Sequence, residues 1–233
     1  MNAQFERLMA RVESLMTRIE SVLPQPLSAP DWTASVAYRY RKRNSGHGLL
    51  EPVKHLGTMS LSDLKEIEDQ KDKIKRNTEQ LVKGVPANNV LLTGSRGTGK
   101  SSLIKACLNE YSAQGLRLIE VDKADLVDLP DIVNLVFGLP EKFIIFCDDL
   151  SFEEGESGYK ALKSILDGSI AAATPNVLIY ATSNRRHLLP EYMTENLTYT
   201  HTADGEVHPG EVVEEKISLS ERFGLWVSFY PFR

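Results

Sequence analysis

Residues 89–107 read Asn-Val-Leu-Leu-Thr-Gly-Ser-Arg-Gly-Thr-Gly-Lys-Ser-Ser-Leu-Ile-Lys-Ala-Cys, and they carry the strongest structural signal in the sequence. Residues 90–93 are a short apolar run with high β-propensity. Residues 94–101 follow as G-x-x-x-x-G-K-S, and residues 102–108 continue with the apolar spacing of a helix. A strand, a glycine-rich loop and a helix in this order are the context that a phosphate-binding P-loop requires.

The loop residues have distinct expected roles. The glycines allow tight turns with positive φ and a close approach of the backbone to an anion. The loop N–H groups and the helix N-terminus then face phosphates with partial positive charge. We expect Lys100 to reach the β- and γ-phosphates and the Ser101 hydroxyl to bind Mg²⁺. The predicted nucleotide-binding residues are Gly94, Ser95, Arg96, Gly97, Thr98, Gly99, Lys100, Ser101 and Ser102.

Composition limits the class of protein. The 233 residues are 42% hydrophobic and 25% charged, which is ordinary for one globular domain with or without a small appendage. A net charge of −5 does not support general polyanion binding. Cys107 and Cys147 both lie in apolar contexts, as core residues of a reduced protein do. We find no signal-peptide pattern and no apolar run that could span a bilayer, so a cytoplasmic protein is expected.

The N-terminal segment carries one apolar stripe at alternating spacings of three and four, which predicts a helix ended by residues 24–26. The favoured interpretation is a helix packed on its own domain. The alternative is a partner-binding or oligomerising helix, because the stripe resembles the a and d positions of a coiled coil. The stripe consists of Phe5, Leu8, Met9, Val12, Leu15, Met16, Ile19, Val22 and Leu23.

Residues 28–45 interleave basic and aromatic side chains, among them Trp32, Tyr38 and Tyr40. Such a mixture can hold single-stranded nucleic acid by stacking and phosphate contacts. A solvated, partly helical charge run is the preferred interpretation. We therefore expect residues 1–55 to form a mostly helical N-terminal region that precedes an α/β core at 56–233.

The core shows strands alternating with helices. After a helix at 60–83 and the loop strand, strand-like runs occur at residues 116–121, 142–148, 176–182 and 225–230. Helical stretches around residues 130–137, 159–166 and 214–223 separate most of them. This alternation predicts a parallel sheet covered by helices on both faces.

Polar residues follow these strands where a parallel sheet binds its ligands. Asp148 and Asp149 end an apolar run, so Asp148 is expected to hold Mg²⁺ and Asp149 to orient or deprotonate the attacking water. Asn184 follows the next strand and can donate to a phosphate oxygen. Arg222 precedes the last strand, where it could point out of the subunit to a γ-phosphate; a surface ion pair is the alternative.

The motifs GSRGTGKS (94–101), FIIFCDD (143–149), LIYATSN (178–184) and SLSERFG (218–224) in this order resemble those of the AAA+ ATPases. The resemblance covers roughly residues 60–233. The stretches DDLSF and SERFGLWVSFYPF are similar to those of a bacterial AAA+ group catalogued as a domain of unknown function.

The resemblance implies a three-layer P-loop NTPase with a five-stranded parallel sheet in the order 5-1-4-3-2. It assigns Walker A to residues 94–101, Walker B to Asp148 and Asp149, sensor 1 to Asn184 and the arginine finger to Arg222. Adenine would lie near residues 64–67. The implied cofactors are ATP or ADP with Mg²⁺. The implied partners are neighbouring subunits, often in a ring of six, and a protein or nucleic-acid client.

Two departures from the AAA+ pattern stand out. The usual Asp-Glu pair of Walker B is Asp-Asp here, so hydrolysis could be slow unless Glu153 or Glu154 helps. The sequence stops just after the last strand, so the helical lid of the family and its second sensor arginine are expected to be absent. Residues 191–215 form a long segment that could contact a substrate or partner, and His201 and His208 within it have no third metal ligand.

Three functions remain open. The leading hypothesis is an Mg-ATP-dependent AAA+ ATPase that remodels a protein or nucleic-acid partner. The second is a nucleotide-gated binding module with weak or no hydrolysis. The third is a small-molecule kinase, which is disfavoured because the LIYATSN and SERFG motifs have no evident use in a monomeric kinase.

Overall fold

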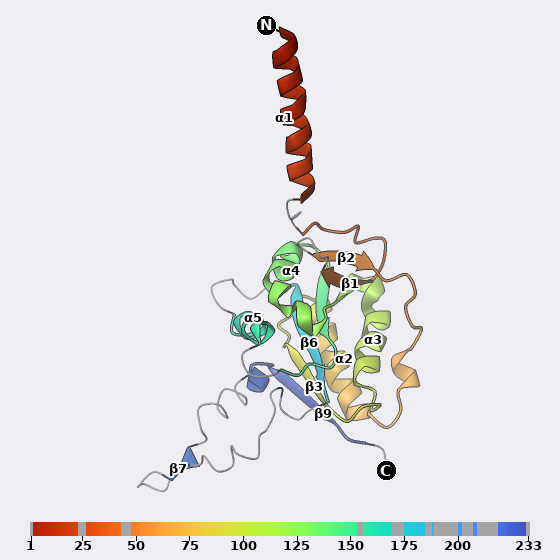
Figure 1. Cartoon of the computed structure of the whole chain (residues 1–233). Helices are drawn as coiled ribbons and strands as arrows, with labels where there is room; N and C mark the ends of the chain where they lie inside the picture. Colours follow the sequence, from red (N-terminus) through yellow and green to blue (C-terminus); the bar gives the residue numbers. More distant parts are fainter. Residues whose placement is uncertain are drawn as a thin grey trace.

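One seven-stranded sheet forms the centre of the part of the chain that the computed structural model describes (Figure 1). The described residues are 2–22, 27–42, 48–152, 156–168, 175–184, 188, 200–201, 207–208 and 219–231. The strands lie side by side in the order β2-β1-β4-β5-β6-β3-β9. Their bounds are β1 Ala37–Lys42, β2 Gly48–Pro52, β3 Val90–Gly94, β4 Leu116–Glu120, β5 Lys142–Cys147, β6 Val177–Ser183 and β9 Leu225–Phe229.

The five strands expected from the sequence run parallel to one another. Numbered along the chain as β3, β4, β5, β6 and β9, they have the spatial order 5-1-4-3-2. This confirms the strand order that the resemblance to AAA+ ATPases implied.

Two further strands correct the prediction for the N-terminal region. β1 pairs in parallel with β4, and β2 pairs antiparallel with β1, so residues 37–52 belong to the core sheet rather than to a helical segment. The sequence carries a strand signal here, because Tyr38 and Tyr40 alternate with charged residues at a period of two. The division of the chain at residue 55 stays a prediction.

The residues of β1 are arranged for folding rather than for base stacking. Tyr38 and Tyr40 are 0% and 1% exposed, so their rings are part of the core. Arg39 donates to Glu120 at 2.9 Å, and Lys42 donates to Asp128 at 2.9 Å. The aromatic side chains of this strand are therefore buried in the core, and its basic side chains are paired with carboxylates.

Helices cover both faces of the sheet, which confirms the predicted three layers (Figure 1). α2 (Glu68–Val82) and α3 (Lys100–Tyr111) pack in one apolar cluster, and α4 (Leu129–Val136) and α5 (Ser157–Leu166) pack in the other. Alternate residues of the central strands enter opposite clusters: Phe146 joins the first and Ile145 the second. The strands are apolar on both sides for this reason.

The connection between α2 and β3 is fixed by a buried polar network. The Tyr180 side chain on β6 is fully buried, and its hydroxyl accepts a 3.0 Å hydrogen bond from Asn77 of α2. Asn77 also binds both backbone groups of Asn88, at 2.8 and 2.9 Å. The network satisfies groups that would be costly to bury unpaired, and it anchors the segment that leads into the glycine-rich loop.

The predicted N-terminal helix is present as α1 (Asn2–Val22). Its packing prediction is wrong, because the side chains from Phe5 to Ile19 are exposed. Between residues 5 and 19 the apolar stripe remains uncovered, with Leu8 and Ile19 59% and 58% exposed. In Figure 1 the helix extends away from the sheet.

The remaining elements are short. The expected helix at 60–83 divides into a 3-10 turn, Leu61–Asp63, and α2, with Glu66 between them at a φ of 63°. Further 3-10 turns are Ser112–Gln114 and Lys123–Asp128, and β7 (Thr200–His201) pairs with β8 (Val207–His208). Glu153, Glu154 and the first half of the expected helix at 214–223, residues 214–218, lie outside the described residues. Within the described part of the chain, no helix is long and apolar enough to cross a membrane.

Candidate functional site

Three neighbouring strands end at one edge of the sheet and bring the predicted motifs together. β6 lies between β3 and β5, with Thr93 in register with Ser183 and Cys147 in register with Ala181. The glycine-rich loop follows β3, and Asp148 directly follows β5. This edge is where an open parallel sheet binds its ligands.

The loop backbone needs its glycines. Gly94, Gly97 and Gly99 have φ values of 140°, 79° and 91°, which L side chains rarely adopt. A Cβ on Gly94 would lie 2.1 Å from the carbonyl oxygen of Phe229, so the space at this position also admits only glycine. The Thr98 hydroxyl donates to the Ser95 carbonyl at 2.8 Å and closes the turn that leads into α3.

Lys100 lies under the loop and is only 6% exposed. Its ammonium group donates to the carbonyls of Gly94 and Ser95 at 2.7 Å each and to Oδ1 of Asn184 at 3.1 Å. Burial lowers the pKa of Lys100, and the carboxylates of Asp148 and Asp149 oppose that shift. The lysine therefore links the loop to the end of β6.

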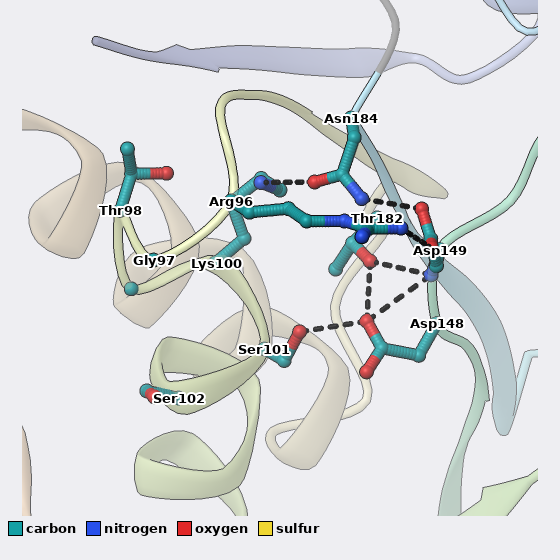
Figure 2. A pocket seen from close by; sticks show the side chains of 11 residues that line it. Arg96, Gly97, Thr98, Lys100, Ser101, Ser102, Asp148, Asp149, Thr182 and Asn184 are labelled. Carbon is teal, nitrogen blue, oxygen red and sulfur yellow. Dashed lines mark hydrogen bonds and ion pairs between the residues drawn. The ribbon is translucent and has the colours of Figure 1, made fainter. Parts of the chain in front are cut away.

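Asp148 is the centre of a hydroxyl cluster. Its Oδ1 accepts hydrogen bonds from Ser101 at 2.6 Å and from Thr182 at 2.5 Å. The Thr182 hydroxyl in turn accepts the backbone N–H of Asp149 at 2.9 Å. Figure 2 shows these side chains facing one another across the pocket. A carboxylate so placed has its orientation set by α3 on one side and by β6 on the other.

Asp149 has an unusual backbone for a residue with a side chain, with a φ of 51°. Such conformations cost about 1–3 kcal/mol and cluster at functional sites. Its carboxylate accepts from Asn184 Nδ2 at 2.5 Å and from Arg96 Nη2 at 3.1 Å. The side chain remains 53% exposed, so it is accessible from the pocket.

These groups line one cavity of about 320 Å³. The pocket brings together nearly all the predicted site residues, and Gly94 and Ser95 contribute the carbonyls that hold Lys100. The functional roles of these residues stay predictions. The cavity is lined by Arg96, Gly97, Thr98, Gly99, Lys100, Ser101, Ser102, Asp148, Asp149, Thr182 and Asn184.

Sequence reasoning missed Thr182, and it predicted Arg96 as a loop residue without predicting the contact of its side chain. Thr182 joins the two aspartates, and the Arg96 guanidinium pairs with Asp149 rather than contributing backbone alone. A signal for Thr182 exists in the sequence, because it lies two positions before Asn184 and strand side chains repeat every second residue. Nothing local to the loop signals the Arg96 contact, which joins residues 53 positions apart.

Arg222 lies at the amino ends of the parallel strands, away from the glycine-rich loop. It precedes β9, whose first residue, Leu225, is in register with Val90 at the amino end of β3. Its Nε donates to Oδ1 of Asp167, which caps the C-terminus of α5. The five residues of β3 therefore separate Arg222 from the loop, about 16 Å at 3.3 Å per residue.

The segment expected near adenine approaches the loop. Ile67 is 5% exposed and immediately precedes α2. A Cβ on Gly99 would lie 3.6 Å from Cδ1 of Ile67. This contact places an apolar side chain beside the N-terminus of α3.

The residues present are suited to Mg²⁺. The Ser101 hydroxyl and the Asp148 carboxylate are oxygen donors 2.6 Å apart at the base of the pocket. Mg²⁺ prefers oxygen ligands, and it commonly takes one or two from the protein and the others from phosphates and water.

The strand order, the glycine loop and the carboxylates after β5 define an α/β fold of the AAA+ type. The sequence from residue 33 to residue 233 matches the family described as "Protein of unknown function (DUF815)". Because this match covers far more than half of the 233 residues, the chain belongs to that family, which confirms the resemblance stated from the sequence. Among curated proteins, none matches the sequence.

Solved structures similar to this chain include a RuvB variant from Thermotoga maritima, with 19% identity, a TM-score of 0.48, and coverage of 73% of this chain and 47% of that one. A DNA replication initiation factor has 18% identity, a TM-score of 0.45, and coverage of 76% and 51%. DnaI has 20% identity, a TM-score of 0.46, and coverage of 93% and 97%. The chain spans about half the length of the RuvB structures. The fold class is assigned from the strand order and the glycine-rich loop, and not from these similarities to solved structures.

Proposed function

We propose that this chain is an Mg-ATP-dependent ATPase of the AAA+ type, which couples ATP binding and hydrolysis to the rearrangement of a protein or nucleic-acid partner. The observation that carries the proposal is the hydrogen-bonded cluster of Ser101, Asp148 and Thr182 beside Lys100. A phosphate-binding loop and an oxygen-ligand pair for Mg²⁺ meet there in one pocket.

Each side chain has a defined task in this proposal. The loop N–H groups and Lys100 bind the phosphates, and Ser101 and Asp148 hold Mg²⁺, which neutralises charge on the β- and γ-phosphates. Asp149 orients the attacking water and accepts its proton. Asn184, which already binds both Lys100 and Asp149, senses the γ-phosphate between them.

Arg222 acts on a neighbouring subunit in this proposal. Its position at the amino ends of the strands supports an action in trans, because the loop of its own chain lies at the other end of β3. An arginine supplied to a γ-phosphate stabilises the charge of the transition state and is worth about 10³–10⁵ in rate. The active enzyme is then at least a dimer and, as in AAA+ proteins generally, a ring. We further propose that it works in the cytoplasm.

A second candidate function is a nucleotide-gated binding module that hydrolyses slowly. It is favoured by Asp149, because its side chain is one methylene shorter than that of the usual glutamate. Its carboxylate also accepts hydrogen bonds from Arg96 and Asn184. In that case the state of the bound nucleotide, rather than turnover, carries the signal to the partner.

Steady-state ATP hydrolysis measured against protein concentration separates these functions. For the ATPase, specific activity rises with concentration, and both Asp149→Asn and Arg222→Ala abolish it while ATP binding persists. Asp167→Asn is the matched control for Arg222, because it removes the ion pair without removing the guanidinium.

The outcomes discriminate between roles as well. Activity in an equimolar mixture of Asp149→Asn and Arg222→Ala chains would establish a shared site, since each variant supplies what the other lacks. If Asp167→Asn lost activity as fully as Arg222→Ala, Arg222 would act through the ion pair alone. Tight ATP binding without turnover at any concentration would overturn the ATPase and leave the binding module.

A further inference from the structure

The exposed stripe of α1 has a regular heptad pattern. Phe5, Val12 and Ile19 occupy the a positions, and Leu8 and Leu15 occupy the d positions. All five side chains are at least 37% exposed, and on a helix this spacing gathers them into one continuous seam. A 21-residue helix offers three heptads, about 31 Å of contact length at 1.5 Å per residue.

The residue types at these positions select a kind of partner. β-Branched residues at a, here Val12 and Ile19, together with leucine at d favour a parallel coiled coil of two helices. The e positions, Met9 and Met16, are also apolar and exposed, so they widen the seam on one side. This pattern is complementary to itself, which is what pairing between two identical helices requires.

Charge gives the orientation of such a pair. The g positions are Arg11 and Arg18, and in an antiparallel pair g faces g, so arginine would lie opposite arginine. In a parallel pair, Arg11 instead faces the Met16 position of the other copy, beside the Glu13 position one turn away. The arginine stem can then cover the methionine while its guanidinium reaches the carboxylate.

The polar face of α1 is less suited to a membrane surface. From residue 5 to residue 19 it carries Arg7, Arg11 and Arg18 against Glu6 and Glu13, so positive charge does not dominate. Helices that lie on membranes are usually rich in lysine or arginine on the polar face and carry strong net positive charge. Self-pairing therefore uses both the apolar and the charged residues, whereas a membrane would use only the former.

We propose that α1 of one chain pairs in parallel with α1 of a second copy to form a two-stranded coiled coil. This contact is independent of nucleotide and of the catalytic pocket, and it goes beyond the proposed ATPase activity. It would hold two cores together before any contact between the cores themselves forms.

The molar mass of the full chain in solution tests the pairing. Light scattering without nucleotide should give at least twice 26.1 kDa for the wild-type chain. The double variant Leu8→Glu and Leu15→Glu places carboxylates in the seam and should give the monomer mass. Ala10→Glu with Thr17→Glu adds the same charge to the exposed opposite face and should keep the wild-type mass. All four positions are exposed on a helix outside the core, so the fold of the core is preserved.

A cysteine cross-link tests the orientation. Phe5→Cys brings two thiols together in a parallel pair, but an antiparallel pair places them at opposite ends of the seam. Mild oxidation should therefore give a disulfide-linked dimer, and the native Cys107 and Cys147 are too buried to contribute.

Three results would overturn the proposal: a monomeric wild-type chain over the whole concentration range, a seam variant with unchanged mass, or no cross-link at Phe5→Cys. Flotation of the wild-type chain, but not the seam variant, with vesicles of phosphatidylcholine and phosphatidylglycerol would assign the stripe to a membrane if the chain is monomeric. None of these results depends on ATP, so they leave the proposed ATPase activity untouched.

Discussion

The hydroxyl of Ser101 donates a 2.6 Å hydrogen bond to the carboxylate of Asp148, although the two residues lie 47 positions apart in the sequence. The bond joins the first turn of α3 to the end of β5 across the intervening strand β6. It brings the two proposed Mg²⁺ ligands, Ser101 and Asp148, together in one pocket.

Replacing Lys100 should weaken ATP binding more than it weakens the fold. Lys100→Ala removes a buried cation that is expected to contact phosphate, and hydrogen bonds to charged groups are worth about 1.5–3 kcal/mol. Calorimetric titration with Mg-ATP should show affinity reduced by about 10- to 150-fold. Lys105→Ala, at an exposed position of the same helix, is the control and should bind normally. Equal affinities of the two variants would contradict phosphate binding by Lys100.

Removing the Thr182 hydroxyl should weaken the apparent affinity for Mg²⁺ during ATP binding. Thr182→Val keeps the shape of this 2% exposed residue but removes one of the donors to Asp148 and the closer of two acceptors of the Asp149 N–H. A hydrogen bond to a charged group is worth about 1.5–3 kcal/mol, so the Mg²⁺ concentration for half-maximal ATP binding should rise about tenfold or more. Thr182→Ser retains the hydroxyl and should restore the wild-type value. An equal defect in both variants would point to packing instead.

Two glycines of the loop should tolerate alanine very differently. In Gly94→Ala the new Cβ meets the Phe229 carbonyl at 2.1 Å, whereas in Gly97→Ala no atom of the described residues lies within 4 Å of it. Both variants carry the backbone strain of positive φ, about 1–2 kcal/mol, but only the first adds overpacking of about 1–3 kcal/mol. Thermal unfolding should therefore show a lower Tm for Gly94→Ala than for Gly97→Ala, by roughly 2–4 °C per kcal/mol. The reverse order would refute the close approach of β9 to the loop.

The two cysteines should be inert in the folded chain. Burial raises the pKa of Cys107 and of Cys147 to about 12, so almost no thiolate is present at about pH 8. A colorimetric thiol reagent should react with neither until denaturant is added, and then with both. Rapid labelling of the folded chain would show that one of the two lies at an accessible surface. Unreactive native thiols are also required for the interpretation of the cross-link at Phe5→Cys.

Local patterns predicted much of this molecule. The GSRGTGKS loop, the apolar run before Asp148 and the polar end of the following strand are contiguous features whose spacing reports a strand, a turn or a helix directly. Once the strands are taken as parallel, their carboxyl ends share one edge, and this is why the predicted residues line one cavity.

The errors arose where one local pattern fits two environments. The stripe of α1 reads the same whether a core or a partner covers it, and only the structure shows that α2 to α5 already occupy both faces of the sheet. In β1 the charged residues favoured the prediction of a solvated, partly helical segment over the strand that the alternation of Tyr38 and Tyr40 indicates. Nothing in the local sequence reveals that β4 lies beside this segment.

Residue types a few positions apart are enough to predict the glycine-rich loop, the five strands and the carboxylates that follow β5. The folded structure was needed to show that Thr182 bridges the two aspartates, that Arg96 pairs with Asp149 and that Arg222 lies at the end of the strands away from the loop. These relationships depend on strand register and loop closure, which are set by packing between segments far apart in the chain.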